Sequence, residues 1–362
     1  MSITKEQVKA AIGSIIDVNT ERDLAVTKSI KSIEIDGGKV SVNIVLGYPA
    51  AGYFDELKSL VSEKVSALDG VESVDVKVSS KIVSHAVQQN LKPQEGIKNI
   101  IAVASGKGGV GKSTTAVNLA LALQAEGATV GILDADIYGP SMPRMLGCTG
   151  QPESIDGKSL EPKVGHGIQS MSIGYLVEED TPMIWRGPMV TQALEQLLND
   201  TNWTNIDYMI IDLPPGTGDI QLTLAQKIPV SGAVIVTTPQ DIALLDARKG
   251  LKMFEKVEVP VLGIVENMSI HICSECGHAE HIFGEGGGQR MAEQYGVDFL
   301  GALPLDIKIR EHADSGNPTV ASMPDSKVSQ IYREIARKTA AKLATKAKDH
   351  SAAFPSIVIQ NN

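Results

Sequence analysis

The amino-acid sequence predicts an α/β protein whose mostly parallel sheet is flanked by helices and preceded by a smaller α+β domain. The chain has 362 residues, 43% of them hydrophobic, which is enough for one large domain and one small one. Strand and helix patterns alternate in both parts. We expect four segments: an α+β domain at 1–80, a linker at 81–97, the large domain at 98–345 and a polar tail at 346–362.

The N-terminal domain is expected to run helix, strand, helix, strand. Helical patterns have apolar residues three or four positions apart, and half-buried strands alternate apolar and polar residues. In chain order these patterns cover residues 4–16, 40–46, 53–68 and 71–78. The following segment is polar and has no period, with Gln88, Asn90 and Pro93 close together, which is typical of a linker.

The large domain contains short apolar runs separated by helical stretches. The runs that predict strands are residues 100–104, 130–133, 208–211, 233–237 and 261–265. Such alternation indicates a mostly parallel sheet with helices on both faces, and ligands of these sheets bind at the carboxyl ends of the strands. A long helix is expected beyond Asp325.

Charge and cysteine content narrow the possible partners. The formal charge is −10 and the sequence pI is near 5.3, so we expect no nucleic-acid partner. The start lacks a signal-peptide pattern and no apolar run reaches the roughly 18 residues that a membrane span needs, which predicts a cytoplasmic protein with no membrane partner. Three cysteines are too few for a disulfide framework.

A phosphate-binding loop follows the first strand of the large domain. Residues 106–113 fit the pattern GxxxxGK[ST], between a strand and a helix, where a ligand-free glycine-rich turn is the simpler alternative. Its glycines can adopt backbone angles closed to other residues, so that successive N–H groups point at an anion. Lys112 can reach the β- and γ-phosphates of ATP, and the Ser113 hydroxyl can hold Mg²⁺. The predicted nucleotide contacts from this loop are Gly106, Lys107, Gly108, Gly109, Val110, Gly111, Lys112, Ser113 and Thr114.

Polar residues close several of the other predicted strands. Asp134 and Asp136 follow one strand and Asp212 ends another, where carboxylates would lie beside the γ-phosphate. Asp212 is the expected second partner of Mg²⁺, through water, and the glycines after it suit a loop that moves with the γ-phosphate. Taken singly, a strand-end aspartate often only caps the next helix. Asn267 follows a later strand and Pro304 lies in a loop beyond it.

The stretch HICSECGHAEH contains a C-x-x-C pair, Cys273 and Cys276, which supplies half of the four ligands that a zinc or iron–sulfur site usually needs. His278 and His281 are too close in sequence to complete a tetrahedral zinc site, and Cys148 would bring the thiols of one chain to only three. A thioredoxin-like redox role would need the pair to open a helix just after an early strand. Two chains would supply four thiolates, for either zinc or a bridging [4Fe–4S] cluster.

The loop residue Lys107 gives the segment KGGVGKS. This segment resembles the signature KGGxGKS of the deviant phosphate-loop ATPases, which include division-site and partition ATPases and nitrogenase iron protein. In that superfamily the extra lysine reaches the nucleotide of a partner subunit. The resemblance therefore implies an ATP-dependent homodimer, whereas the simpler interpretation of Lys107 is a solvated loop charge.

Further motifs narrow the resemblance to one family. KGGVGKS, DADIYGPS, IWRGPM, IIDLPPGTGD and ENMS followed by CxxCG resemble the Mrp/Nbp35 (ApbC) family of iron–sulfur cluster carrier ATPases. The N-terminal part resembles the MIP18 (DUF59) domain. The resemblance implies a slow ATPase that carries a labile [4Fe–4S] cluster on Cys273 and Cys276 of two subunits and passes it to apo-proteins.

The resemblance also implies roles for single residues. Asp136 would orient the attacking water, with Lys107 and Lys112 as the other catalytic residues, while Asn267 would contact adenine by its side chain and the Pro304 region by shape. Some MIP18 domains carry a reactive cysteine, but residues 1–147 contain none. We therefore expect a docking or regulatory role for the N-terminal domain.

Two other functions remain as alternatives. A partition or positioning ATPase, with a structural zinc bridging the dimer, would act on a membrane or on DNA. It would need an amphipathic anchor or basic patches, whereas the last helix is rich in Ala and Lys and the chain is acidic. An electron-transfer protein like nitrogenase iron protein would use two well-separated cysteines in place of a C-x-x-C pair.

Overall fold

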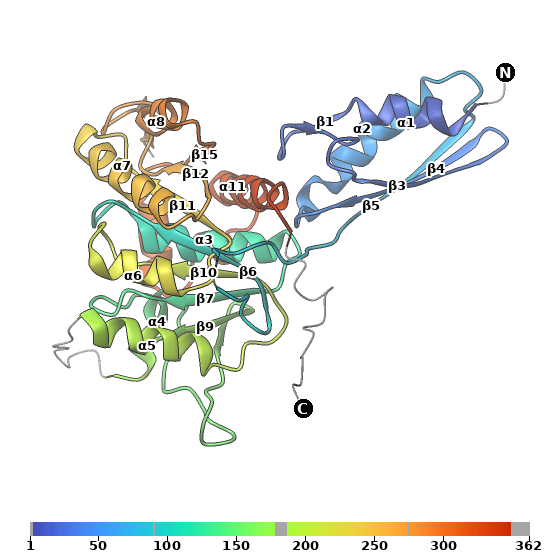
Figure 1. Cartoon of the computed structure of the whole chain (residues 1–362). Coiled ribbons are helices and arrows are strands. Elements are labelled where there is room, and N and C mark those ends of the chain that lie inside the picture. Colours follow the sequence, from blue (N-terminus) through green and yellow to red (C-terminus); the bar gives the residue numbers. More distant parts are fainter. Residues whose placement is uncertain (1–2, 90, 178–186, 274, 349–362) are drawn as a thin grey trace, which may run out of the picture.

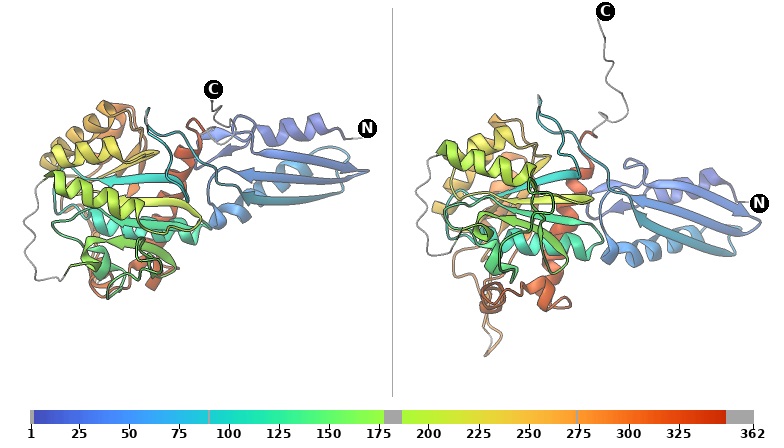
Figure 2. Two further views of the ribbon diagram at one scale, coloured as in Figure 1. Left: turned by 60° about the horizontal axis from the view of Figure 1, so that its bottom comes forward. Right: turned by 90° about the horizontal axis from the view of Figure 1, so that it is seen from below.

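The computed structural model describes residues 3–89, 91–177, 187–273 and 275–348. Figure 1 shows two lobes, a smaller N-terminal lobe in blue and a larger lobe that contains the rest of the described chain. Both views in Figure 2 show the last helix, in red, at the junction of the two lobes.

The N-terminal domain is a three-stranded sheet with two helices packed on one face. The sheet has the order β3-β4-β5, in which β4 pairs antiparallel with β3 and parallel with β5. Its elements are α1 (Lys5–Gly13), β1 (Ile16–Asp17), β2 (Arg22–Asp23), β3 (Ile30–Asp36), β4 (Lys39–Leu46), η1 (Ala51–Tyr53), α2 (Phe54–Ser66) and β5 (Ser73–Ser80).

The expected order of helix, strand, helix, strand was wrong, because it omits β3 and the short pair β1 and β2. Strand β3 is an edge strand with no fully buried side chain, and Lys31, Glu34 and Asp36 weaken its apolar alternation. The predicted helix over residues 4–16 ends at Gly13. Its start is fixed by Thr4, whose hydroxyl accepts the N–H of Gln7 while the Gln7 side chain accepts the N–H of Thr4.

The large domain is built on an eight-stranded sheet of order β15-β12-β11-β6-β10-β7-β9-β8. All neighbours run parallel except β8 and β9, so the predicted mostly parallel sheet is confirmed. The five predicted runs lie in β6, β7, β10, β11 and β12, whereas β8, β9 and β15 were not predicted. The strands are β6 (Ile97–Ala104), β7 (Val130–Asp134), β8 (Lys163–Gly165), β9 (Ile168–Ser172), β10 (Ile206–Asp212), β11 (Gly232–Thr237), β12 (Val261–Glu266) and β15 (Phe299–Ala302).

Helices cover both faces of this sheet. One buried cluster joins α3 and α11 to one face, and two others join α5, α6, α7 and α8 to the opposite face. Among the described residues no helix has the length and apolar character that crossing a bilayer requires. The helices are α3 (Lys112–Ala125), α4 (Met142–Met145), α5 (Gly187–Asn199), α6 (Asp219–Lys227), α7 (Asp241–Lys256), α8 (Gly287–Tyr295), α9 (Ile307–Asp314), α10 (Thr319–Ser322) and α11 (Lys327–Ala344), the last being the long helix expected beyond Asp325.

The two domains share a core and a buried ion cluster. The fully buried carboxylate of Glu126, just after α3, lies 2.7 Å from Arg333 Nε and 2.7 Å from Arg337 Nη1, both on α11. The same carboxylate accepts the N–H of Gly52 from the N-terminal domain at 2.8 Å. The apolar cores of the N-terminal domain and of the α3–α11 layer form one continuous cluster. Glu126 therefore links the helix of the phosphate loop to the N-terminal domain.

The segment between the domains is anchored at two buried side chains. His85 donates its backbone N–H to Asn99 Oδ1 on β6, and the Gln88 amide donates to the carbonyl of Ala225 at 2.7 Å. Residues 85 and 88 are thus packed against the large domain even though the sequence around them is polar.

Candidate functional site

The loops that follow β6, β7 and β10 converge at the carboxyl edge of the sheet. These strands are neighbours, and Asp212 at the end of β10 is paired in register with Asp134 at the end of β7. The loops enclose a cavity of about 230 Å³. Its lining residues are Ser105, Lys107, Gly108, Gly109, Gly111, Lys112, Ser113, Thr114, Asp136 and Pro215.

The four glycines of the phosphate loop have different structural requirements. Gly109 and Gly111 have φ of 82° and 80°, in the left-handed region that favours glycine. A Cβ on Gly106 would lie 2.1 Å from the backbone carbon of Asp246 in α7, so this position is glycine because of packing. Gly108, expected from sequence to need special angles, does not have a positive φ, and a Cβ there would meet no atom within 4 Å.

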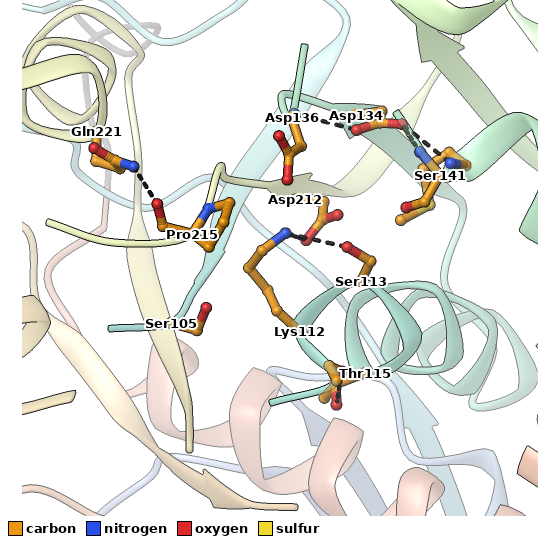
Figure 3. Close-up of polar contacts among 12 residues, drawn as sticks. Ser105, Lys112, Ser113, Thr115, Asp134, Asp136, Ser141, Asp212, Pro215 and Gln221 are labelled. Atoms are coloured by element: carbon orange, nitrogen blue, oxygen red, sulfur yellow. Dashed lines mark hydrogen bonds and ion pairs between the residues drawn. The ribbon is translucent and has the colours of Figure 1, made fainter. Parts of the chain in front are cut away.

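Lys112 lies at the bottom of the cavity, between a carboxylate and a hydroxyl (Figure 3). Its ammonium is 2.6 Å from Asp212 Oδ1 and donates to Ser113 Oγ at 3.1 Å. The second oxygen of Asp212, Oδ2, is buried and has no hydrogen-bond partner in the described part of the chain. An unpartnered carboxylate oxygen of this kind is suited to accept a hydrogen bond from a water ligand of Mg²⁺.

Asp134 and Asp136 have different environments although they are two residues apart. Asp134 is fully buried, and its Oδ2 accepts the N–H groups of Ser141 and Met142 and the hydroxyl of Ser172. Asp136 lines the cavity, and Figure 3 shows that its carboxylate points toward the end of the Lys112 side chain. Burial raises the pKa of Asp136, and the charge of Lys112 opposes that shift.

These environments give the two aspartates different roles. Asp134 holds the segment after β7 in place, and burial together with the charge of Asp212 raises its pKa. Of the two carboxylates, only that of Asp136 lines the cavity in the described part of the chain.

The loop after β10 is held to the phosphate loop. The N–H of Gly216 donates to the carbonyl of Ser105 at 2.9 Å, and the Gln221 amide donates to the carbonyl of Pro215 at 2.6 Å. Ser105 in turn donates its hydroxyl to the carbonyl of Lys107. Sequence reasoning missed Gln221 and Pro215, because a glutamine on a helix and a proline in a loop carry no local signal of this contact.

Asn267 lies against the phosphate loop. Its amide donates to the carbonyl of Val110 at 2.8 Å, and a Cβ on Gly111 would lie 2.2 Å from the Asn267 nitrogen. The loop that contains Pro304 is adjacent, because the N–H and the hydroxyl of Ser269 both donate to the carbonyl of Leu303. The structure therefore brings Asn267 and the Pro304 loop together.

The cysteine pair lies in a small hairpin formed by β13 (His271–Ile272) and β14 (Ala279–Glu280). The N–H of Cys273 donates to the carbonyl of His278, and the N–H of Gly277 donates to that of Cys273, each at 2.9 Å. Cys273 is half-buried and Cys276 is exposed. The backbone N–H groups of Cys276 and Glu275, followed by the Cys276 side chain, lower the pKa of the Cys273 thiol, which favours the thiolate that binds metals.

The hairpin supplies no complete metal site from one chain. Within the described ranges, no group of three or more Cys, His, Asp or Glu side chains is placed to hold a metal ion. His281 Nδ1 is bonded to the carbonyl of Ser269 at 2.7 Å, and His278 is exposed. Cys148 belongs to the core of the large domain, where its thiol contacts the Leu146 carbonyl.

One motif of the sequence analysis is only partly described. Residues 184–186 of IWRGPM lie outside the described residues, and its remaining residues, 187–189, open helix α5.

Two family models match the chain. Residues 96–340 match the NUBPL iron-transfer P-loop NTPase, and residues 5–78 match the iron–sulfur cluster assembly protein family. A protein of Escherichia coli K12 named iron–sulfur cluster carrier protein is 55% identical over 89% of this chain and 88% of its own. The mouse iron–sulfur cluster transfer protein NUBPL is 50% identical over 76% of this chain and 86% of its own.

Solved structures agree with the fold. A nucleotide-binding protein of Archaeoglobus fulgidus, solved in complex with ADP, has a TM-score of 0.54 at 39% identity, over 61% of this chain and 88% of its own. The cell division ATPase MinD of Pyrococcus furiosus has a TM-score of 0.50 at 22% identity, over 66% of this chain and 97% of its own, and supports the fold alone. With its phosphate loop, its exposed cysteine hairpin and these matches, the chain belongs to the NUBPL family of iron-transfer P-loop NTPases and carries an N-terminal iron–sulfur cluster assembly domain.

Proposed function

We propose that the chain is an ATP-binding and ATP-hydrolysing carrier of iron–sulfur clusters, which holds a [4Fe–4S] cluster between two copies and passes it to apo-proteins. The observation that carries the proposal is the short connection between its two candidate sites. Asn267 is bonded to the phosphate loop at Val110, and Cys273 follows only a few residues later, in a hairpin with two thiols at or near the surface.

The nucleotide would occupy the cavity at the carboxyl edge of the sheet. The N–H groups from Gly106 to Thr114 would surround the phosphates, with Asn267 and the loop of Pro304 at the adenine. The ammonium of Lys112, which is paired with Asp212 in the structure, would bind the phosphates instead when nucleotide enters the cavity, because Lys112 also lines that cavity. Ser113 and Asp212 would hold the Mg²⁺ of Mg·ATP, which neutralises phosphate charge when it is bound.

Hydrolysis needs a water molecule in line with the γ-phosphate, and Asp136 is the residue positioned to orient it. Its carboxylate lines the cavity, whereas Asp134 is fully engaged by backbone N–H groups. The loop of residues 213–218 is tied to Ser105 through Gly216, so a change at the γ-phosphate would reach it directly. Lys107, half-buried in the cavity wall, would act on the nucleotide of the partner subunit.

A homodimer would complete both sites. Apolar side chains are exposed along the edge that carries the nucleotide cavity and the hairpin: Tyr138 53%, Ile242 69%, Leu245 53% and Ile272 57%. Such side chains at one edge favour contact with a second copy. The dimer would bring together Cys273 and Cys276 of both copies, and these four thiolates are the number that the cargo cluster needs.

Each of the four segments expected from the sequence would have its own role. Residues 98–345 would form the ATPase, residues 1–80 a docking or regulatory domain, residues 81–97 the connection between them and residues 346–362 a polar tail. Residues 3–80 contain no cysteine, so the N-terminal domain would not hold the cluster.

The deciding experiment is anaerobic reconstitution with iron and sulfide, followed by metal and sulfide counts, an absorption spectrum and a molecular mass. We expect about four iron and four sulfide ions per dimer. Cys273→Ala and Cys276→Ala should lose them, while Cys148→Ala, the matched control, should keep them. A zinc content of one per dimer in protein isolated without added metal, with no cluster after reconstitution, would favour the positioning ATPase.

An assay of cluster transfer distinguishes a cluster carrier from an electron-transfer protein. The loaded dimer should convert an apo-protein with four free thiols to its [4Fe–4S] form, with loss of the cluster from the donor. Reduction of an acceptor with the cluster retained by the donor would contradict the proposal.

A further inference from the structure

A second cavity lies away from the nucleotide site, where the N-terminal domain meets the C-terminal end of α11. Its volume is about 460 Å³, within the range of small-molecule sites. Three stretches of chain form its walls: residues 20–31, residues 45–48 with 81–85, and residues 344–348. The second and third walls are joined, since residues 85 and 348 form an isolated antiparallel bridge and the N–H of Ala86 donates to the carbonyl of Ala347 at 2.9 Å.

The charge of this cavity is opposite to that of the chain. Its lining includes six cationic side chains and no carboxylate, although the whole sequence has 43 acidic and 33 basic residues. None of the six has an ion-pair partner among residues that the structure describes. They are Arg22, Lys28, Lys31, Lys81, Lys346 and Lys348.

Two acidic residues close to the first wall, Asp17 and Glu21, are engaged elsewhere. Both oxygens of Asp17 accept the hydroxyl of Tyr48 at 2.8 Å, and Asp17 is not among the lining residues. Glu21 is paired with Lys342 at 2.9 Å. The cavity therefore gathers positive charge with no carboxylate in its described lining, and the mutual repulsion of these charges favours an anion between them.

The first wall presents hydroxyl and ammonium groups to the cavity. Lys28 has φ of 54°, a left-handed conformation that is unusual for lysine, and its carbonyl accepts the ammonium of Lys31 at 2.9 Å. The hydroxyls of Thr27 and Ser29 form a hydrogen bond with each other at 2.8 Å, and both residues line the cavity. Fixed hydroxyls beside unpaired ammonium groups suit an acid with several oxygen atoms.

We propose that this cavity binds a small polyanion, no larger than a nucleotide, that carries two or more phosphate or carboxylate groups. Lys28 of the N-terminal domain, Lys81 of the connection and Lys346 beyond α11 contact the anion together. A bound anion thereby adds to the shared core that joins the N-terminal domain to α11, which packs on the helix of the phosphate loop. Enclosure by three walls favours a small ligand over an acidic protein surface.

The test is calorimetric titration of the full chain with inorganic tripolyphosphate, for which the proposed nucleotide site predicts a second binding site at the phosphate loop. Wild-type protein should show two sites. The variant Lys28→Gln, Lys81→Gln, Lys346→Gln should keep the loop site and bind at the cavity at least about tenfold more weakly, because three exposed charge contacts are lost. The control variant Lys9→Gln, Lys64→Gln, Lys77→Gln removes the same charge from exposed positions in the same domain and should retain both sites.

Unchanged ATP hydrolysis and circular dichroism would show that both variants are folded. A parallel titration with citrate decides whether carboxylates suffice or phosphate is required. Three results would overturn the proposal: one site in the wild-type protein, equal weakening in both variants, or tighter binding of hexaglutamate than of either small anion at the cavity.

Discussion

The ammonium of Lys112 and the carboxylate of Asp212 form an ion pair of 2.6 Å in which the two side chains are only 6% and 0% exposed. The pair joins the start of α3 to the end of β10 across the nucleotide cavity. Removing either partner alone would leave the other as a buried charge, a loss that usually exceeds the net value of the pair.

A double-mutant cycle on this pair should show strong coupling. Lys112→Met should lower the free energy of unfolding by about 3 kcal/mol, because Asp212 keeps an uncompensated charge. Adding Asp212→Asn should restore most of that loss, since the amide is neutral. Urea denaturation without nucleotide measures both values.

The exposed pair Lys58–Asp55 provides the control, with Asp55 96% exposed. The same cycle there should give a coupling below about 1 kcal/mol. Additive effects of the two substitutions at Lys112 and Asp212 would show that the pair does not stabilise the apo-protein.

Asp136→Asn should slow hydrolysis and leave nucleotide binding intact. The carboxylate lines the cavity, and no hydrogen bond or ion pair among the described residues joins it to the phosphate loop, so its loss removes chiefly the group that would orient water. We expect a decrease in kcat of roughly 10²- to 10⁴-fold. Steady-state hydrolysis and ADP titration measure the two quantities, with Asp156→Asn in an exposed loop as the control. An equal loss of ADP affinity would assign Asp136 to binding.

The pH dependence of hydrolysis should also identify Asp136. Burial raises the pKa of this carboxyl above the ordinary value of about 3.9. The ionised carboxylate is the form that would orient water. The value of kcat is therefore maximal above the raised pKa and falls as the pH drops through that pKa. The acid limb of kcat should therefore lie above about pH 4 and be absent from the residual activity of Asp136→Asn. An acid limb that persists in the variant would belong to another group.

The sequence predicted the position of the phosphate loop because the signals of that loop are local. A phosphate loop needs Gly109, Gly111 and Lys112 within a few positions of one another, between a strand and a helix, and the structure has that arrangement. Strands β6 and β10 are buried over most of their length and contain continuous apolar runs, at residues 100–104 and 208–211, which mark them in the sequence.

The missed features depend on distant partners. Strand β3 is an edge strand with charged residues, and β15 is four residues long and contains Gly301. Glu126 follows a helix like any solvated surface charge, and only the tertiary structure places Arg333 and Arg337 against it. The requirement for glycine at position 106 comes from the backbone of α7, about 140 residues later in the chain.

Glu126→Gln should weaken the junction of the two domains. The amide can still accept the N–H of Gly52, but it leaves Arg333 and Arg337 without their buried counter-charge. We expect the free energy of unfolding to fall by about 3 kcal/mol and residues 81–97 to become easier to cleave by protease. Glu63→Gln, on the exposed face of α2, serves as the control. Unchanged cleavage in Glu126→Gln would show that the apolar core alone holds the domains together.

Alanine substitutions at two glycines of the phosphate loop should have different effects, one on protein stability and the other on nucleotide binding. Gly106→Ala places a Cβ 2.1 Å from the backbone of α7, so it should destabilise the protein even without nucleotide. Gly108→Ala meets no atom within 4 Å and needs no left-handed backbone, so the apo-protein should keep wild-type stability. Its methyl group would nevertheless enter the space for phosphates, and ADP should bind at least about tenfold more weakly. Thermal unfolding and ADP titration of both variants measure these effects. Normal ADP affinity in Gly108→Ala would place the phosphates elsewhere in the cavity.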